Sequence, residues 1–238
     1  MDSAAVDALL DSIIAEEDEQ RFNKFRNLFP AEGPFRRELY PRHMEFFRVG
    51  ATHRERLFMA GNRTGKTIAG AFEVACHLTG LYPDWWEGRR FRRAGRWWVA
   101  GDTNETTRDI LQLELLGEVG YSGARKILDG SGIIPRETIG DPIWKNGVQN
   151  LVDNIHIKHA SGDHSLLSFK SYDQGRRVFQ GTAKEGIWLD EECPKDVYEE
   201  CLMRTATTRG LIMTTFTPLL GMSEVVMSFL PKEMRPTD

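Results

Sequence analysis

The amino end of the chain has the pattern of an amphipathic helix. Apolar residues recur there at helical spacing: Val6, Leu9, Leu10, Ile13 and Ile14. One stripe of this kind is typical of a helix with a single buried face, and an acidic run at residues 16–19 follows it. We expect the helix to pack on its own domain with the acidic run in solvent. A docking helix for a partner is the alternative, and exposure of the stripe distinguishes the two.

The next pattern is a set of short apolar runs. Residues 30–43 hold several prolines and a glycine and predict an extended loop, because proline is excluded from helix interiors. Apolar strand-length runs then follow at 57–60, 97–100, 187–189 and 211–213. Helical periodicity follows the first two runs, over 68–78 and 110–116. Buried strands that alternate with helices predict an α/β fold with a mainly parallel central sheet flanked by helices.

A hairpin is predicted between the second and third runs. Residues 155–159 alternate in polarity, residues 166–169 form another short strand, and Ser161-Gly162-Asp163 lies between them. We expect an antiparallel hairpin addition to the sheet. The glycine-rich segment 117–147 is expected to be a surface excursion in which Pro135 and Pro142 are turn residues.

Composition sets the size and class of the protein. With 238 residues, 40% hydrophobic and 28% charged, the chain predicts a folded protein with room for one large domain. We expect residues 1–35 to form the helix and an extended lead-in, and residues 36–238 to form that domain. The three cysteines, Cys76, Cys193 and Cys201, match neither a disulfide scaffold nor a zinc site. We expect a chain that is neither secreted nor embedded in a membrane.

Charge narrows the means of contact with nucleic acid. The formal net charge is −4, so no global basic field is present and any such contact must use a local patch. The densest basic run is residues 89–93, which Trp85 and Trp86 precede. Arginines beside aromatic residues suggest contact with a phosphate backbone, and a solvated loop is the alternative.

A candidate phosphate loop lies between the first strand and its helix. Residues 60–67 read A-G-N-R-T-G-K-T. In such a loop, backbone N–H groups and the helix amino terminus converge on phosphate oxygens. Lys66 would reach the β- and γ-phosphates of a nucleotide, and the Thr67 hydroxyl would ligate Mg²⁺. Ala60 stands where the consensus has glycine, so a chance match at a helix start is the alternative. The rest of the nucleotide-binding set is Gly61, Asn62, Arg63, Thr64 and Gly65.

A second motif delivers acids to the end of a strand. Residues 186–192 read G-I-W-L-D-E-E, and nucleotide sites of open α/β sheets lie at the carboxyl ends of strands. Asp190 would hold the Mg²⁺ shell, and Glu191 would act as general base on the attacking water. An acidic helix amino terminus is the alternative. A third motif, residues 213–218, places threonines at a strand end, where they either sense a γ-phosphate or simply suit a strand.

These motifs, in this order, resemble the large terminase subunit of tailed double-stranded DNA bacteriophages, an ATP-driven genome-packaging motor, most closely its headful-packaging branch. The similarity extends over nearly the whole chain. It includes residues 40–46, 59–62, 65–66, 73–75, 77–80, 103–106, 174–176, 188, 190–192, 215–219 and 221–223.

The resemblance implies a phosphate-loop NTPase of the catalytic-glutamate (RecA/terminase-like) class, with ATP and Mg²⁺ as cofactors. Arg63 fits an arginine common in the family's loop, as a lid on the phosphates or a transition-state charge. Arg176 is the candidate arginine finger supplied to a neighbour. His43 stands where such families often carry an adenine-reading glutamine, a departure from the pattern. The family's coupling motif, which links hydrolysis to domain motion, matches Thr214, Thr215, Thr217 and Pro218.

The resemblance also implies partners. They are double-stranded DNA, the portal protein, the small terminase subunit and further copies in a ring on the capsid, with a monomer in solution and a location in the host cytoplasm. Full-length members carry a nuclease domain, so from a chain that stops at Asp238 we expect ATP hydrolysis without DNA cleavage. The alternatives are a helicase- or recombinase-like ATPase, a small-molecule kinase, and a nucleotide-binding assembly module without turnover.

Overall fold

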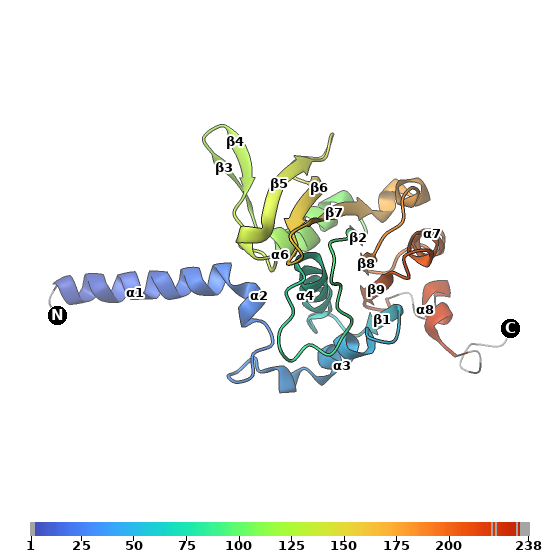
Figure 1. Ribbon diagram of the computed structural model, residues 1–238, viewed down its shortest axis with the longest axis horizontal. Helices are drawn as coiled ribbons and strands as arrows, with labels where there is room; N and C mark the ends of the chain where they lie inside the picture. Colours follow the sequence, from blue (N-terminus) through green and yellow to red (C-terminus); the bar gives the residue numbers. More distant parts are fainter. Residues whose placement is uncertain (1–2, 220, 222, 232, 234–238) are drawn as a thin grey trace.

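A seven-stranded sheet forms the centre of the computed structural model, which describes residues 3–219, 221, 223–231 and 233 (Figure 1). Five neighbouring strands are parallel: β1 (Glu55–Met59), β9 (Leu211–Phe216), β8 (Gly186–Asp190), β2 (Arg96–Gly101) and β7 (His164–Ser171). Two antiparallel strands complete the sheet beyond β7: β6 (Val152–Lys158) and β5 (Ile139–Trp144). The parallel sheet and the β6–β7 hairpin that the sequence predicted are both confirmed.

Helices cover both faces of the parallel strands. On one face lie α4 (Lys66–Thr79) and α3 (Pro41–Val49), and on the other lie α7 (Lys195–Ala206) and α8 (Glu224–Phe229). Successive residues of a strand point to opposite faces, so Trp188 packs with the α4 core while Leu189 packs with the α7 core. This double burial explains why the strands read as continuous apolar runs rather than as alternating ones.

Helix α4 is fixed to the sheet by two close contacts. A Cβ at Gly70 would lie 2.3 Å from the Trp188 ring, so glycine lets the helix approach β8 closely. Arg56 of β1 donates to both carboxylate oxygens of Glu73, at 2.6 and 3.0 Å, and this pair is buried. The start of α4, where the candidate phosphate loop ends, is therefore held in a defined position over the carboxyl ends of the strands.

The helix after β2 begins earlier than its apolar periodicity predicted. It comprises α5 (Asn104–Thr106), a π-helical turn (Thr107–Gln112) and α6 (Leu113–Leu116). Thr103 caps its amino end, because its hydroxyl accepts the Thr106 N–H at 3.2 Å and the Thr106 hydroxyl accepts the Thr103 N–H at 3.0 Å. A polar capping box starts a helix without an apolar signal, so the predicted start at residue 110 was late.

Two prolines occupy positions that the sequence analysis assigned to loops. Pro41 is the first residue of α3, where its missing N–H costs no helical hydrogen bond, so the predicted loop 30–43 ends earlier than expected. The loop also contains a short 3₁₀ turn, Arg37–Leu39.

Pro142 lies within β5, an edge strand, which tolerates a residue without an N–H. The segment 117–147 is thus more ordered than a plain excursion: it also holds the hairpin of β3 (Val119–Ser122) and β4 (Arg125–Leu128).

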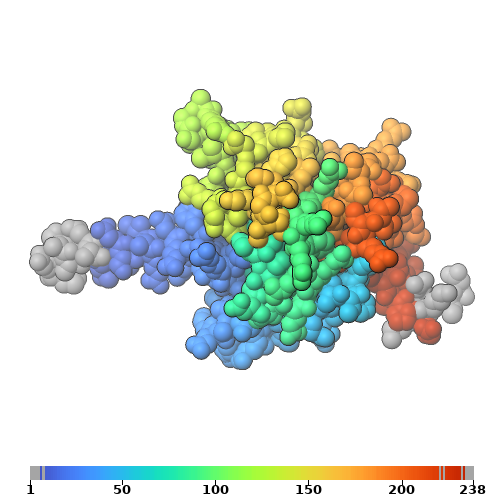
Figure 2. Space-filling model, in the orientation of Figure 1, coloured from blue at the N-terminus to red at the C-terminus, as the bar shows by residue number. Residues whose placement is uncertain are grey.

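Helix α1 (Ser3–Phe22) projects from the body of the molecule (Figures 1 and 2). Its apolar stripe is in solvent: Leu9 is 58% exposed, Leu10 51%, Ile13 44% and Ile14 55%. The expectation that this stripe packs on its own domain is therefore wrong, because periodicity reveals an apolar face but not what covers it. The chain joins the core just after this helix, through α2 (Lys24–Asn27), where Phe25 stacks on Phe72.

Candidate functional site

The candidate phosphate loop connects β1 to α4 at the carboxyl end of the parallel strands. Gly65, at its end, has φ +80°, and a Cβ there would lie 3.0 Å from Nε2 of His43, so both conformation and space require glycine. Arg63 also has a positive φ, 59°. The Thr64 hydroxyl closes the loop by donating to the carbonyl of Gly61 at 2.9 Å. The segment is a tight turn that delivers its last residues to the helix amino terminus.

Lys66 is the first residue of α4, and its side chain is buried against this loop. Its Nζ donates to the Gly61 carbonyl at 2.7 Å and to Oγ1 of Thr217 at 3.0 Å. The Thr217 hydroxyl in turn donates to Oδ1 of Asn62 at 2.8 Å. Among the described residues, Lys66 has no carboxylate partner. An ammonium group that is buried and held only by neutral oxygens has charge available for an anion.

Asp190 ends β8 beside the amino terminus of α4. The Thr67 hydroxyl donates to its carboxylate at 3.2 and 3.3 Å, and the Thr215 hydroxyl donates to Oδ1 at 2.6 Å. Trp188 then donates from Nε1 to the Thr215 hydroxyl at 2.7 Å, which makes a continuous hydrogen-bonded series that ends on Asp190. Burial raises the pKa of Asp190 to about 7. Burial makes the ionised form of this carboxylate unfavourable, and a bound cation would stabilise that form, so the position suits a cation site.

Glu191 leaves the strand in a left-handed conformation with φ +64°. Its N–H donates to the Thr215 carbonyl at 2.8 Å, which fixes the backbone, while the residue as a whole is exposed. It lines a pocket of about 570 Å³ together with Lys66, Thr67 and Thr217. Positive φ outside glycine is uncommon and often accompanies functional sites. The turn directs adjacent acids differently: Asp190 towards Thr67 and Glu191 towards the open pocket.

The other predicted residues divide into those at the pocket and those away from it. Arg63 lines the pocket and forms no hydrogen bond or ion pair with any described residue. Pro218 follows Thr217 but does not line the pocket. Thr214 is fully buried and shares with Ile212 and Phe216 the face of β9 opposite Thr215, because strand residues alternate. Of the predicted coupling residues, then, Thr217 reaches the loop, Thr215 reaches Asp190, and Thr214 points away from both.

Arg176 is also placed away from the phosphate loop. It lies in a short 3₁₀ segment, Arg176–Phe179, and its Nε donates to Glu200 of α7 at 2.9 Å. Glu200 is bound as well by Arg204, at 3.0 Å. The Arg176 side chain is 44% exposed and is absent from the pocket lining. Within one chain, therefore, Arg176 forms an ion pair with Glu200 of α7 and does not reach the phosphate loop.

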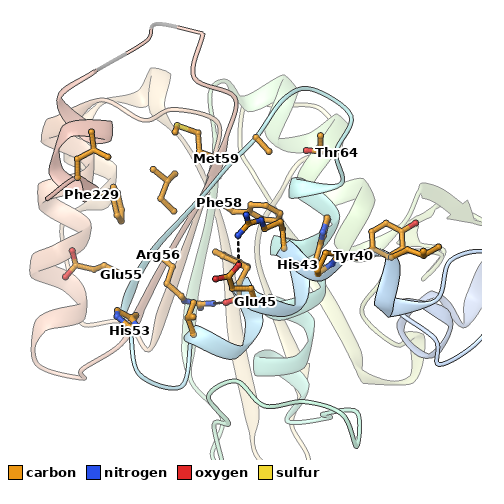
Figure 3. A pocket seen from close by; sticks show the side chains of 18 residues that line it. Tyr40, His43, Glu45, His53, Glu55, Arg56, Phe58, Met59, Thr64 and Phe229 are labelled. Atoms are coloured by element: carbon orange, nitrogen blue, oxygen red, sulfur yellow. Dashed lines mark hydrogen bonds and ion pairs between the residues drawn. The ribbon is translucent and has the colours of Figure 1, made fainter. Parts of the chain in front are cut away.

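A larger cavity, of about 1010 Å³, adjoins the phosphate loop (Figure 3). Its wall includes His43 of α3, Phe58 of β1, Thr64 of the loop and Phe229 of α8, and Figure 3 shows Phe229 on the side opposite His43. Burial lowers the pKa of His43, while hydrogen bonds to the backbone of Gly65 and Thr64 oppose that change. The His43 imidazole thus packs against the backbone of the phosphate loop at Thr64 and Gly65, and it also forms part of the cavity wall.

Some residues of the site carried no role in the sequence analysis. Trp188 was expected to be part of a strand, and its indole instead orients Thr215. The Tyr172 hydroxyl, just after β7, donates to the backbone carbonyl of Asp190 at 2.9 Å and so holds the carboxyl end of β8 in place. Tyr40 lines the pocket beside the loop. Tyr172 follows a strand directly, and that position is the one signal in the sequence that could have indicated it.

Other predicted features have plainer outcomes. Trp85 and Trp86 both pack against Phe47 and Phe72: Trp86 is a core residue, and Trp85 is half-buried against the core, so neither stands free as a platform for bases. Within the described part of the chain, no group of His, Cys, Asp and Glu side chains is arranged to bind a metal by itself. The three cysteines are free and buried. In the same described ranges, every helix is too short or too polar to cross a bilayer.

Known proteins resemble this chain in sequence and in fold. Residues 57–237 match the family described as "Terminase large subunit, T4likevirus-type, N-terminal". The large terminase subunit of Salmonella phage P22 is 40% identical over 210 residues, which cover 80% of this chain and 41% of that protein. The large terminase of a thermophilic bacteriophage has the same fold, with a TM-score of 0.51 at 11% identity over 74% of this chain and 37% of that one.

The family match and the fold agree with the geometry of the site. The chain spans about two-fifths of the length of the Salmonella phage protein. Its phosphate loop and its two adjacent acids lie inside the matched range. Because the family match covers well over half of the chain, this protein belongs to the large terminase subunits of tailed bacteriophages and carries their N-terminal, phosphate-loop α/β domain.

Proposed function

We propose that this chain is the ATPase motor of a large terminase, which hydrolyses ATP to drive double-stranded viral DNA into a procapsid. The observation that carries the proposal is the convergence of Lys66, the Thr67–Asp190 pair and Glu191 on one pocket at the carboxyl end of the sheet. Each group has a separate task in phosphoryl transfer to water.

Substrate binding follows from the shapes of the two hollows. The phosphates of ATP occupy the pocket lined by Asn62, Lys66 and Thr217. The base and ribose extend into the larger cavity, past His43 and towards Phe229. Thr67 and Asp190 offer adjacent hard oxygen donors, 3.2 Å apart, which fit Mg²⁺. When bound, Mg²⁺ supplies neutralisation of the charge on the phosphate oxygens.

Hydrolysis then depends on the chain's own residues. Glu191 accepts a proton from a water molecule that is in line with the γ-phosphate, and its left-handed backbone aims the carboxylate into the pocket. Lys66 stabilises the negative charge on the phosphate oxygens. Arg63, free and at the pocket rim, is positioned to cover the phosphates or to stabilise the transition state.

Coupling to motion begins with the partners of Lys66. In the structure, Nζ of Lys66 donates to the Gly61 carbonyl and to the Thr217 hydroxyl. Phosphate oxygens compete for the same ammonium group, so ATP binding frees Thr217, which lies between β9 and α8. Helix α8 follows Thr217 along the chain and carries Phe229 of the cavity wall, so its position responds to the state of the nucleotide.

The proposal extends to assembly. The motor works as a ring on the portal protein, together with the small terminase subunit, in the host cytoplasm, and is a monomer in solution. A neighbour in the ring supplies an arginine finger; Arg176 serves in that role when its ion pair with Glu200 opens.

The test is release of phosphate from Mg·ATP over a range of protein concentrations, with Lys66→Ala as the blank. We expect turnover that the variant lacks and that rises more than linearly with concentration, because a neighbour completes the site. Binding of ATP without turnover at any concentration would favour the non-hydrolysing assembly module. Absence of ATP binding would refute the motor assignment.

The hydrogen bond from Trp188 provides a finer prediction. We expect Trp188→Phe to raise the Mg²⁺ concentration for half-maximal ATPase activity by roughly tenfold, because Thr215 loses the donor that orients it towards Asp190. At saturating Mg²⁺ the kcat should recover. Trp98→Phe is the matched control, since Trp98 is also buried but faces the α7 side of the sheet. An equal change in both variants would mean that packing, not metal positioning, is responsible.

A further inference from the structure

The basic run of residues 89–93 belongs to a wider positive surface at the amino ends of the parallel strands. Arg54 precedes β1, Arg96 begins β2, Lys184 lies just before β8, and Arg209 lies just before β9. The loop that carries the basic run leads into β2 at the same edge. This edge is opposite the one that holds the phosphate loop, since parallel strands bring all their amino ends together.

Hydrogen bonds join these loops into one surface. Arg89 donates from Nη1 to the carbonyl of Arg209 at 2.7 Å, and Arg54 donates from Nε to the carbonyl of Gly210 at 3.2 Å. The Arg96 carbonyl accepts the Glu185 N–H at 3.0 Å. In Figure 2 the green loop before β2 lies across the face turned to the viewer, near the orange segment that leads to β9.

The loop with the basic run is also anchored from inside. The Tyr82 hydroxyl accepts the Phe91 N–H at 2.7 Å, and it is bound to Nδ1 of His77 on α4 at 2.9 Å. Trp86 is buried, and its Nε1 donates to the Arg89 carbonyl at 3.0 Å. The arginine side chains therefore project from a rigid backbone, and little conformational entropy is lost by the loop when they bind a partner.

The positive charge of this surface is not paired with acids. Within the described ranges, none of these guanidinium groups forms an ion pair: Arg54, Arg89, Arg92, Arg93, Arg96 and Arg209. Arg54 and Arg89 donate only to backbone carbonyls. The acids at this edge include Glu55, Asp84 and Glu87, which are exposed, and Glu185, whose carboxylate accepts the Arg96 N–H.

At this edge the pKa values of Lys184 and Arg89 are lowered first by burial and then by neighbouring arginines. Burial and then the neighbouring charge of Arg96 lower the pKa of Lys184 to about 8, and the charge of Glu185 opposes this change. Burial and then the charge of Arg54 lower the pKa of Arg89. In a chain with a net charge of −4, such a concentration of positive charge at one edge is a departure from the overall balance.

We propose that this surface binds the phosphate backbone of duplex DNA. Guanidinium groups match phosphate geometry, and the exposed ones, Arg92, Arg93 and Arg209, are free to donate. Trp86 is buried, and the half-buried Trp85 ring stacks on Phe72 with Arg37 over it, so the proposed contact uses arginines rather than base stacking and is independent of sequence. The inference rests on the proposed function in one respect: it assigns the surface of the motor on which the translocated DNA lies.

The position of the surface has a mechanical consequence. ATP binds at the carboxyl ends of β1, β8 and β9, while DNA binds at their amino ends, so the two ligands do not compete for space. The strands and α4 form a rigid connection between the two edges. Motion of one edge relative to a neighbouring subunit therefore moves the bound backbone.

The experiment measures binding of a fluorescent DNA duplex by anisotropy over a series of salt concentrations, with the full chain. For Arg92→Ala/Arg93→Ala we expect roughly tenfold weaker binding near 0.1 M salt, and a slope of log affinity against log salt that is smaller by about 2. Arg26→Ala/Arg125→Ala is the matched control, because it removes the same charge from exposed arginines of α2 and β4, away from this edge and from the nucleotide pocket. The control should bind nearly as wild type does.

Each other outcome overturns the assignment. Failure of the wild-type chain to bind the duplex at low salt removes the surface as a DNA site. Equal weakening in both double variants means that the attraction is diffuse rather than local. ATP hydrolysis without DNA, measured on the same proteins, keeps the two proposals separate. A wild-type chain that hydrolyses ATP but does not bind the duplex refutes the surface alone, and a wild-type chain that binds the duplex but does not hydrolyse ATP refutes the motor alone.

Discussion

Glu191→Gln is expected to lower the kcat for ATP hydrolysis by about 10²–10⁴-fold while leaving the affinity for Mg·ATP nearly unchanged. The amide has the size and shape of the carboxylate but cannot accept the proton of the attacking water. Because Glu191 is exposed in the pocket and fixes the backbone through its own N–H, the substitution leaves the turn after β8 intact. Single-turnover hydrolysis and equilibrium binding of a fluorescent ATP analogue measure the two quantities separately.

Glu192→Gln is the matched control for this experiment. It removes one carboxylate from the adjacent residue, which does not line the pocket. We expect its kcat to lie within a few-fold of the wild-type value, since surface charge changes of this kind have small effects. If Glu191→Gln hydrolysed ATP as fast as Glu192→Gln does, Glu191 would not be the base, and the assembly module without turnover would become the better description.

Lys66→Ala is expected to abolish measurable turnover and to weaken ATP binding by about 10–100-fold. This loss of affinity follows from the removal of charge-assisted hydrogen bonds to phosphate, worth roughly 1.5–3 kcal/mol. Lys66 is buried without a carboxylate partner in the described structure, so its removal also relieves an uncompensated charge. We therefore expect thermal unfolding of the variant without nucleotide to occur at the wild-type temperature or slightly above it.

That pairing of results distinguishes a lost ligand contact from a damaged fold. Lys195→Ala serves as control, because Lys195 is half exposed and its ion pair with Glu224 is on the surface. It should retain both binding and turnover. A Lys66→Ala protein that unfolds at a much lower temperature would contradict the assignment of Lys66 as a phosphate ligand, since its role would then be structural.

Local chemistry was the most predictable part of this protein. The strand–loop–helix around Gly65 and Lys66, and the acids after the strand at 186–190, are short segments whose residues are neighbours along the chain. Parallel strands bring their carboxyl ends together, so the meeting of Thr67 with Asp190 followed from the two motifs and the fold class. Hydrophobic periodicity likewise predicted the strands, because burial on both faces requires continuous apolar runs.

By itself, then, the sequence determined the α/β class, the strand positions and the two phosphate-site motifs, because each depends on local conformational preference and on short spacings. The tertiary structure alone decided which neighbours those residues meet. Because successive side chains of β9 point to opposite faces of the sheet, Thr215 faces Asp190 and Thr214 faces away from it. The packing of loops that are distant in sequence brought Arg54, Arg89 and Arg209 together at one edge, and no periodic pattern of residues predicts such packing. Tertiary structure also left the apolar stripe of α1 exposed to solvent.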